Sequence, residues 1–329
     1  MKTSLLINAG LLLALLGAAC SRPGLAPEEV TPVACPDLPV PPNGPGRISS
    51  GPARSYHLPC FNPRNPQELA FCLNDAANPA ATGVYIGNLA TRQQRLIWPG
   101  APGVHLGLSW SSRGWLAFSR DDQVWKIKSN GDSLTQLTFG PPHYGPQWSP
   151  DGLRFVCRLP NDPVAPLLLF DHRGRQLARL RGYPTGYAKA WSPDGHKLLV
   201  EYGGDEQGYG LGVYDLTTDQ SELLVPSDVA GSAAGLLTGA AWLPDSRTVV
   251  WAAGTGLYRT DTHTRQTRQL HPGCGTRTYT WPGVAADGRT IVVTRVDRRS
   301  LNDEGTRVYV ERNLWLMDAD GSNERKLEF

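Results

Sequence analysis

The sequence predicts an all-β protein, and within that class a six-bladed β-propeller made of four-stranded antiparallel blades. A short motif recurs six times along the 329 residues, at spacings of 49, 38, 43, 51 and 42 residues. Each copy is followed by short apolar segments of strand length. Glycine (36 residues) and proline (28 residues) make up about a fifth of the chain, which suits many turns and few long helices. A repeat of about 40–50 residues with four strands per unit is typical of propeller blades.

The recurring motif combines a wedge residue with a tight turn. Its clearest copies are Gln147–Gly152 (QWSPDG) and Ala190–Gly195 (AWSPDG). Weaker copies begin at Trp110 and Trp242, and degenerate ones at Val284 and Phe61. We expect the tryptophan to fill space between neighbouring blades, and Pro-Asp-Gly to form the hairpin between the first two strands. The wedge and turn residues so assigned are Trp110, Trp148, Trp191, Trp242, Asp151, Gly152, Asp194, Gly195, Asp245, Asp287 and Gly288.

Apolar segments predict the remaining strands of each blade. The segments that follow the motif are Leu69–Leu73, Leu116–Ser119, Arg154–Arg158, Lys197–Tyr202, Thr248–Ala252 and Thr290–Thr294. The next set is Val84–Asn88, Gln123–Ile127, Leu167–Asp171, Gly212–Asp215, Gly256–Thr260 and Leu314–Asp318. Outer strands are expected at Thr135–Thr138, Ser221–Val225 and Arg325–Glu328. Blade one should take its innermost strand from Ser55–Phe61, leaving a ring closed by packing between Phe61 and Val284.

The motif and the segment Leu314–Asn323 (LWLMDADGSN) together resemble the WD40-like repeat of TolB-type propellers. The resemblance runs from about Phe61 to Phe329. It concerns the propeller of TolB, whose additional α/β domain has no counterpart in the proline-rich stretch before blade one. The resemblance implies a non-enzymatic module that binds proteins or serves as a scaffold, without cofactor or metal.

The N-terminus has the features of a lipoprotein signal. An apolar run from Leu5 to Ala19 is too short to span a bilayer comfortably but suits a signal-peptide core. Leu16–Cys20 (LGAAC) resembles the lipobox of bacterial lipoproteins, which implies acylation of Cys20; the alternative is a secretory signal cut after Ala19. We therefore predict a signal peptide at 1–19, a lipidated cysteine and proline-rich spacer at 20–54, and a propeller at 55–329. This layout implies attachment to a membrane of the bacterial cell envelope, expected to be the outer membrane facing the periplasm.

Export to an oxidising space allows disulfides among the six cysteines. Cys60 and Cys72 fall on the first two strands of blade one and are predicted to pair across the hairpin. Cys157 aligns with packed valines of other blades and should be a buried free thiol. A pairing of Cys35 with Cys274 stays open.

No pattern in the sequence predicts catalysis. The nucleophile elbow, the phosphate-binding loop and the zinc-binding His-Glu-x-x-His motif are all missing. The repeated aspartates are expected far apart on one rim, as turn residues rather than metal ligands. A net charge of +2 argues against nucleic acid as a partner. We expect a monomer whose partner is an envelope protein or a cell-wall component; the alternative is an enzyme or small-ligand binder that uses the central channel.

Two charged segments leave their roles open. Asp297–Glu304 (DRRSLNDE) is either a solvated loop or a loop that contacts a partner. Four arginines crowd the outer hairpin of blade three, where they either block edge-to-edge pairing or meet an anionic partner. They are Arg173, Arg175, Arg179 and Arg181.

Overall fold

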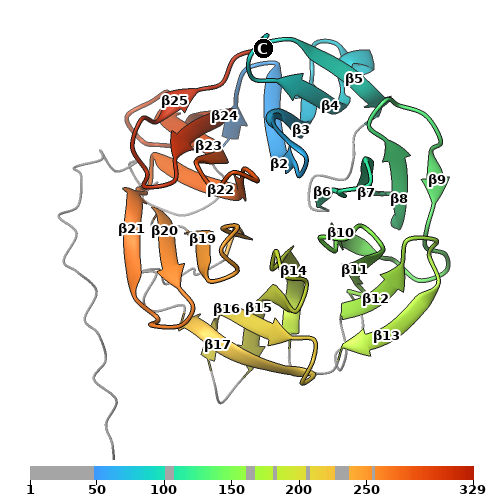
Figure 1. Ribbon diagram of the computed structural model, residues 1–329. Coiled ribbons are helices and arrows are strands. Elements are labelled where there is room, and N and C mark those ends of the chain that lie inside the picture. The colour runs from blue at the N-terminus through green and yellow to red at the C-terminus, as the bar shows by residue number, and fades with distance from the viewer. Residues whose placement is uncertain are drawn as a thin grey trace, which may run out of the picture.

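The computed structural model describes residues 48–100, 107–160, 167–180, 184–204, 208–226, 237–253 and 256–329. They form six antiparallel sheets arranged around a common centre (Figure 1). The helical content of these residues is a single 3-10 turn, η1 (Pro79–Ala81). The all-β, six-bladed prediction is confirmed.

The first three blades follow the order of the chain from the centre outward. Blade one contains β2 (Arg54–Asn62), β3 (Asn65–Asp75), β4 (Gly83–Asn88) and β5 (Gln94–Pro99). Blade two contains β6 (Leu108–Trp110), β7 (Trp115–Arg120), β8 (Gln123–Lys128) and β9 (Thr135–Gln136). Blade three contains β10 (Tyr144–Trp148), β11 (Arg154–Arg158), β12 (Leu167–Asp171) and β13 (Gln176–Leu180).

The last three blades repeat this plan, with one addition in blade six. Blade four contains β14 (Pro184–Trp191), β15 (Lys197–Gly204), β16 (Gly208–Asp215) and β17 (Gln220–Pro226). Blade five contains β18 (Gly239–Trp242), β19 (Thr248–Ala253), β20 (Gly256–Asp261) and β21 (Thr267–Pro272). Blade six contains β22 (Arg277–Val284), β23 (Thr290–Ser300), β24 (Arg307–Asp318) and β25 (Arg325–Lys326), joined by β1 (Ile48–Ser50).

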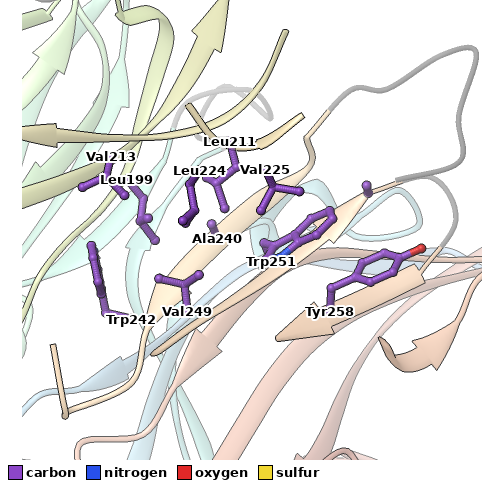
Figure 2. Close-up of a cluster of buried hydrophobic side chains, with 11 residues drawn as sticks. Leu199, Leu211, Val213, Leu224, Val225, Ala240, Trp242, Val249, Trp251 and Tyr258 are labelled. Carbon is purple, nitrogen blue, oxygen red and sulfur yellow. The ribbon is translucent and has the colours of Figure 1, made fainter. Parts of the chain in front are cut away.

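Apolar side chains form six clusters, one between each pair of neighbouring blades. Figure 2 shows the cluster between blades four and five, where Trp242 lies beside Leu199 and Val249. Trp110, Trp148 and Trp191 occupy the equivalent places in three other clusters. The wedge role predicted for the motif tryptophans is therefore what the structure shows, because each contacts strands of two blades.

The seam between blades six and one lacks a wedge tryptophan but is rich in other aromatic side chains. Phe61 and Phe71 pack there with Leu314 and Leu316 of β24. The C-terminal residue, Phe329, stacks on Phe71 with ring centroids 5.2 Å apart, and the C-terminus lies between β25 and the strands of blade one (Figure 1). Phe71 and Phe329, which lie outside the motif, thus fill the space that a wedge tryptophan fills in other clusters.

The expectation that packing alone closes the ring is wrong, because strand β1 adds backbone pairing to blade six. It pairs in parallel with β24, with Ile48 opposite Arg307 and Ser50 opposite Tyr309. The Ile48 amide donates to the carbonyl of Thr306 at 2.9 Å. The chain then enters β2, the innermost strand of blade one, as predicted. Backbone hydrogen bonds therefore tie the segment before blade one to blade six, and β1 lies within the stretch interpreted as spacer.

Candidate functional site: the central channel and its rims

In five blades the innermost strand has a positive φ three residues before the wedge position. There the backbone turns to positive φ at Gly107 (+71°), Gly145 (+63°) and Gly239 (+154°) of blades two, three and five. A Cβ on Gly107 would lie 2.9 Å from the Cα of Gly145, and one on Gly239 would lie 2.8 Å from the Cα of Trp281. Glycine is needed at both positions because neighbouring backbones approach closely and because a side chain would be strained there.

Blades one and six place large side chains at this same level. Leu58 has φ +53° and Trp281 has φ +48°, and a proline follows each of them. The strands bulge here, with register shifts between His57 and Cys60 and between Thr280 and Gly283. A left-handed backbone costs an ordinary residue about 1–2 kcal/mol, and such strain gathers at functional sites. Leu58 and Trp281 are therefore the first residues to consider for a role in the channel.

A cavity of about 260 Å³ lies at this level of the channel. Leu58 and Trp281 form one side of its wall, Gly107 and Gly145 another, and Ser109 and Gln147 contribute polar side chains. All eighteen lining residues are uncharged. Cys60 is the one lining residue with a thiol, and burial raises its pKa, so the wall carries no group poised to exchange protons near neutral pH.

His57 lies behind Trp281, at the junction of blades one and six. It is 6% exposed, its ring meets the indole of Trp281 edge-on at 5.8 Å, and its Nε2 lies 3.0 Å from Ser55 Oγ. Burial, with a smaller contribution from the positive charge of Arg312, lowers the pKa of His57 to about 4. His57 is therefore neutral at physiological pH and acts there as a packed ring.

The repeated aspartates bond within their own turns. Asp151 Oδ1 accepts from the Leu153 amide at 2.9 Å, and Asp194 Oδ1 accepts from the His196 amide at 2.9 Å. Asp245 and Asp287 accept in the same way from the amides of Arg247 and Arg289. Glycines at the adjacent turn position have positive φ: Gly152 (+66°), Gly195 (+78°) and Gly288 (+70°). The part of the chain that the structure describes contains no group of three or more metal-ligating side chains.

These turn bonds affect the titration of the aspartates. The pKa values of Asp151, Asp194 and Asp245 are lowered overall: burial alone would raise them, but hydrogen bonds donated to the carboxylates outweigh that effect. The carboxylates therefore stay ionised while they hold their turns, as expected for turn residues.

The cysteine pairing predicted in blade one is wrong: Cys60 and Cys72 are both free thiols. Cys72 lies opposite His57 and Cys60 lies opposite Ala70, so the two cysteines are diagonal neighbours. Diagonal Cα atoms are about 7–8 Å apart, whereas a disulfide needs about 4.4–6.8 Å. Cys157 is buried and free, as predicted.

Of the remaining three cysteines, the structure describes only Cys274. Cys274, in the loop before β22, is disulfide-bonded. Cys35, the partner considered for it, and Cys20, the predicted lipidation site, lie outside the described residues. The predicted signal peptide and most of the predicted spacer lie outside them as well.

The charged segment of blade six extends a β-hairpin, with its first half in a strand and residues 301–304 in the turn. Asp297–Ser300 continue β23 and pair with β24 up to Ser300 opposite Val308. Blades two and five turn earlier, after Arg120 and Ala253. Residues 296–312, called here the blade-six finger, extend roughly 17 Å past that level at about 3.4 Å per residue.

The tip of the finger carries apolar and charged groups side by side. Leu301 is 48% exposed, and Ile48 of the adjoining β1 is 69% exposed. Arg299 lies over the ring of Tyr309 at 4.5 Å, and Leu301 donates its amide to the carbonyl of Arg307 at 2.8 Å. Backbone pairing and ring contacts hold the finger, so its exposed side chains project from a firm support.

The arginines of blade three form a less organised surface. Arg175 pairs with Asp171 at 3.2 Å while remaining 78% exposed, which is worth little in stability. Arg173 and Arg175 also donate backbone amides to Asp171 Oδ1. Arg181 lies outside the described residues. The structure favours the interpretation of this hairpin as a charged outer edge.

Neither the positive-φ residues that face the channel nor the strand β1 was predicted from the sequence. A signal for the first was present: Gly-x-x-Trp precedes the turn in blades two, three and five, while Leu58-Pro59 and Trp281-Pro282 stand at the same offset in blades one and six. For β1 there was no comparable signal, because three residues in a proline-rich stretch show no periodicity.

Comparisons with known proteins agree with the ring. No family model matches the sequence, and no curated protein matches it. A protein designated TolB from Agrobacterium tumefaciens has a TM-score of 0.58 at 19% identity, covering 74% of this chain and 87% of that one. TolB from Acinetobacter baumannii has a TM-score of 0.53 at 18% identity, covering 64% of this chain and 53% of that one, so this chain spans about half of that protein. An oligogalacturonate lyase from Vibrio parahaemolyticus has a TM-score of 0.51 at 13% identity, covering 83% of this chain and 77% of that one.

Identities this low establish the fold and leave activity to be argued from the site. No helix within the described ranges has both the length and the apolar character needed to cross a membrane. The α/β domain expected of TolB itself has no equivalent among the described residues, which are strands apart from η1. The chain folds as a TolB-like six-bladed β-propeller.

Proposed function

We propose that this protein is a non-enzymatic lipoprotein of the bacterial cell envelope whose propeller binds a protein partner through the blade-six finger. The observation that supports this most is the tip of the finger, where the exposed side chains of Leu301 and Ile48 stand on a hydrogen-bonded support. Apolar groups held on a rigid element and bordered by charge are typical of interaction sites.

The mixed charge of the tip favours a protein over an anionic polymer. Arg299 and Arg307 are exposed there, and so are Asp303 and Glu304. A cell-wall polyanion would gain no net attraction there, because the two carboxylates offset the two arginines, whereas a protein surface can present both signs in register. Nucleic acid is disfavoured for the same reason, and we propose that the protein acts as a monomer.

The wall of the channel supports a non-enzymatic role. Its described side chains include no carboxylate, histidine or lysine, whereas general acid–base catalysis needs a titratable group within reach of the substrate. The scaffold interpretation is consistent with this, because a propeller offers rigid rims irrespective of the chemistry of its centre.

Photo-crosslinking in intact envelopes tests the finger. A photoreactive residue at position 301 should give one discrete protein adduct, and Arg307→Glu should abolish that adduct. The matched control is position 177, where Leu177 is 44% exposed; its strand, β13, lies across the ring from β24 (Figure 1). The same adducts from both positions, or none from position 301, would exclude the finger as the binding surface.

Membrane attachment has its own test. Cys20→Ala removes the thiol that would be acylated and should move the protein from the membrane fraction to the soluble fraction, because stable anchoring requires the acyl chains. Ser21→Ala, beside it, should leave the distribution unchanged. A Cys20→Ala protein that still sediments with membranes would contradict lipidation as the anchor.

A further inference from the structure

The blade level that holds Leu58 and Trp281 carries an indole ring that packs in part against the cluster between blades one and two. Blades two, three and five have glycine at the equivalent position, and in blades two and three its φ is close to that of Trp281; glycine carries no steric penalty there. Trp281 accepts a strained backbone and places a large ring where the other blades have none. Its side chain is only partly buried, and it lines the cavity of about 260 Å³.

We propose that this cavity binds an uncharged sugar ring, stacked on the indole of Trp281. The first reason is that the indole is fixed before any ligand arrives. The Trp281 amide donates to the carbonyl of Thr238 at 3.2 Å, the edge-on contact with His57 supports the ring, and Pro282 restricts the backbone that follows. A platform that does not need to be ordered upon binding loses less conformational entropy.

The second reason is the polar character of the opposite wall. Ser109 and Gln147 line the cavity together with Gly107 and Gly145, whose lack of side chains leaves the peptide groups close to the cavity. A sugar presents apolar C–H faces toward an aromatic ring and hydroxyl groups around its edge. Ser109 Oγ already accepts from the Trp148 amide at 2.9 Å, so the polar group of this wall that most needs a ligand partner is the Gln147 side chain, which a purely apolar ring would cover without a hydrogen bond.

The third reason concerns charge. All of the residues that line the cavity are uncharged, so a carboxylate or ammonium group entering it would lose hydration without gaining a counter-ion. The site should therefore prefer neutral sugars such as N-acetylglucosamine over uronic acids or amino sugars. A volume of about 260 Å³ is large enough to accommodate a sugar ring.

Ligand-observed NMR on the full chain tests the proposal with three probes of similar size: N-acetylglucosamine, galacturonate and glucosamine. Saturation transfer is expected for the neutral sugar and at least tenfold less for the two charged ones. Trp281→Gly restores the residue that suits φ +48° and removes the platform, and it should reduce transfer to the neutral sugar at least tenfold. Transfer that is equal for all three probes, or unchanged in Trp281→Gly, would overturn the proposal.

A second variant keeps the test decisive if Trp281→Gly does not fold. Gln147→Leu preserves most of the side-chain volume and removes the amide, and it should weaken binding of N-acetylglucosamine several-fold with a cooperative melting transition retained. Leu301→Glu, on the blade-six finger, should not change sugar binding. This control separates the sugar site from the proposed protein-binding surface, because each can fail without the other. Wild-type protein that shows no transfer from the neutral sugar would also overturn the proposal.

Discussion

Single side chains in the turns hold the geometry of the rim. Asp194 accepts from Ser192 Oγ at 2.6 Å and from the His196 amide at 2.9 Å. Ser192 is fully buried and also bonds the backbone of Lys197, with its Oγ 3.1 Å from that carbonyl. The carboxylate therefore connects a buried hydroxyl to the start of β15.

Asp194→Ala should lower the free energy of unfolding by about 1 kcal/mol, because it removes the acceptor of the His196 amide and one of the two acceptors of the buried Ser192 hydroxyl. Urea denaturation followed by tryptophan fluorescence measures the change. Asp303→Ala, at an exposed position of the blade-six finger, is the control and should shift the midpoint little. Equal effects of the two substitutions would show that the turn bond contributes nothing specific.

The three free thiols give a second prediction at this scale. Burial raises the pKa of Cys72 to about 12 and raises those of Cys60 and Cys157, so thiolate is scarce at pH 8. Cys72 and Cys157 are buried as well, whereas Cys60 is half-buried in the cavity wall and is protected by its raised pKa alone. Iodoacetamide should leave all three unlabelled in the folded protein and label all three in guanidinium chloride. Peptide mass spectrometry without reduction should find no link between Cys60 and Cys72; such a link would contradict the register of β2 against β3.

At the scale of elements, the short strand β1 contributes more than its three residues suggest. It covers the edge of β24 at the blade-six finger, and Gly51 follows it so closely that a Cβ there would lie 2.4 Å from the carbonyl oxygen of Val310. The same edge of β24 pairs with β25 farther along. Two short strands from opposite ends of the described chain thus protect one outer strand.

Ile48→Pro should weaken this attachment, because proline has no amide to donate to Thr306. We expect a loss of about 1 kcal/mol and faster hydrogen exchange at residues 307–309. Ser49→Pro is the matched control: alternate residues of a parallel strand direct their amides to opposite sides, so that of Ser49 points away from β24. If both variants exchange like the wild type, β1 does not hold the finger.

At the scale of the whole molecule, closure of the ring depends on the junction between blades six and one. That junction contains the aromatic cluster of Phe61, Phe71 and Phe329 and, nearer the channel, the contact of His57 with Trp281. Both ends of the described chain meet there, with β1 on blade six and Phe329 against Gly87 of blade one. The stability of the junction should therefore report on the ring as a whole.

His57 makes that stability depend on pH. Its pKa is lowered to about 4 in the folded protein, against an ordinary value of about 6.5 in the unfolded chain. Between these pH values the unfolded chain binds the proton more readily than the folded protein does. His57 therefore does not lower the stability of the protein above pH 6.5, and it lowers that stability progressively as the pH falls from 6.5 to 4. The loss from this group reaches at most about 3 kcal/mol.

Comparison of wild type with His57→Gln isolates this contribution, because other titrating groups act on both proteins. On going from pH 7 to pH 4, the wild type should lose about 3 kcal/mol more of its free energy of unfolding than His57→Gln does. Denaturation at several pH values measures this. Parallel pH profiles would show that His57 is solvated or moves when protonated.

The sequence by itself determined the blade plan. The wedge-and-turn motif sets where each hairpin begins, and Arg154–Arg158 and Leu167–Asp171 appear with the predicted bounds. The local chemistry explains this success, because Asp-Gly turns and apolar segments are stabilised by contacts within a few residues. The burial of Cys157 followed from the same periodicity.

Only the tertiary structure decided how the ring closes and what faces its centre. The Cys60–Cys72 prediction failed because the register of the hairpin places Cys60 opposite Ala70, two residues from Cys72 along β3, and no pattern in the sequence fixes that register. The pairing of Ile48 with Arg307 and the meeting of Leu58, Trp281 and Gln147 at one cavity join residues far apart in the chain. Such contacts form only when all six blades are arranged in a closed ring, and the local preferences of the sequence do not specify that arrangement.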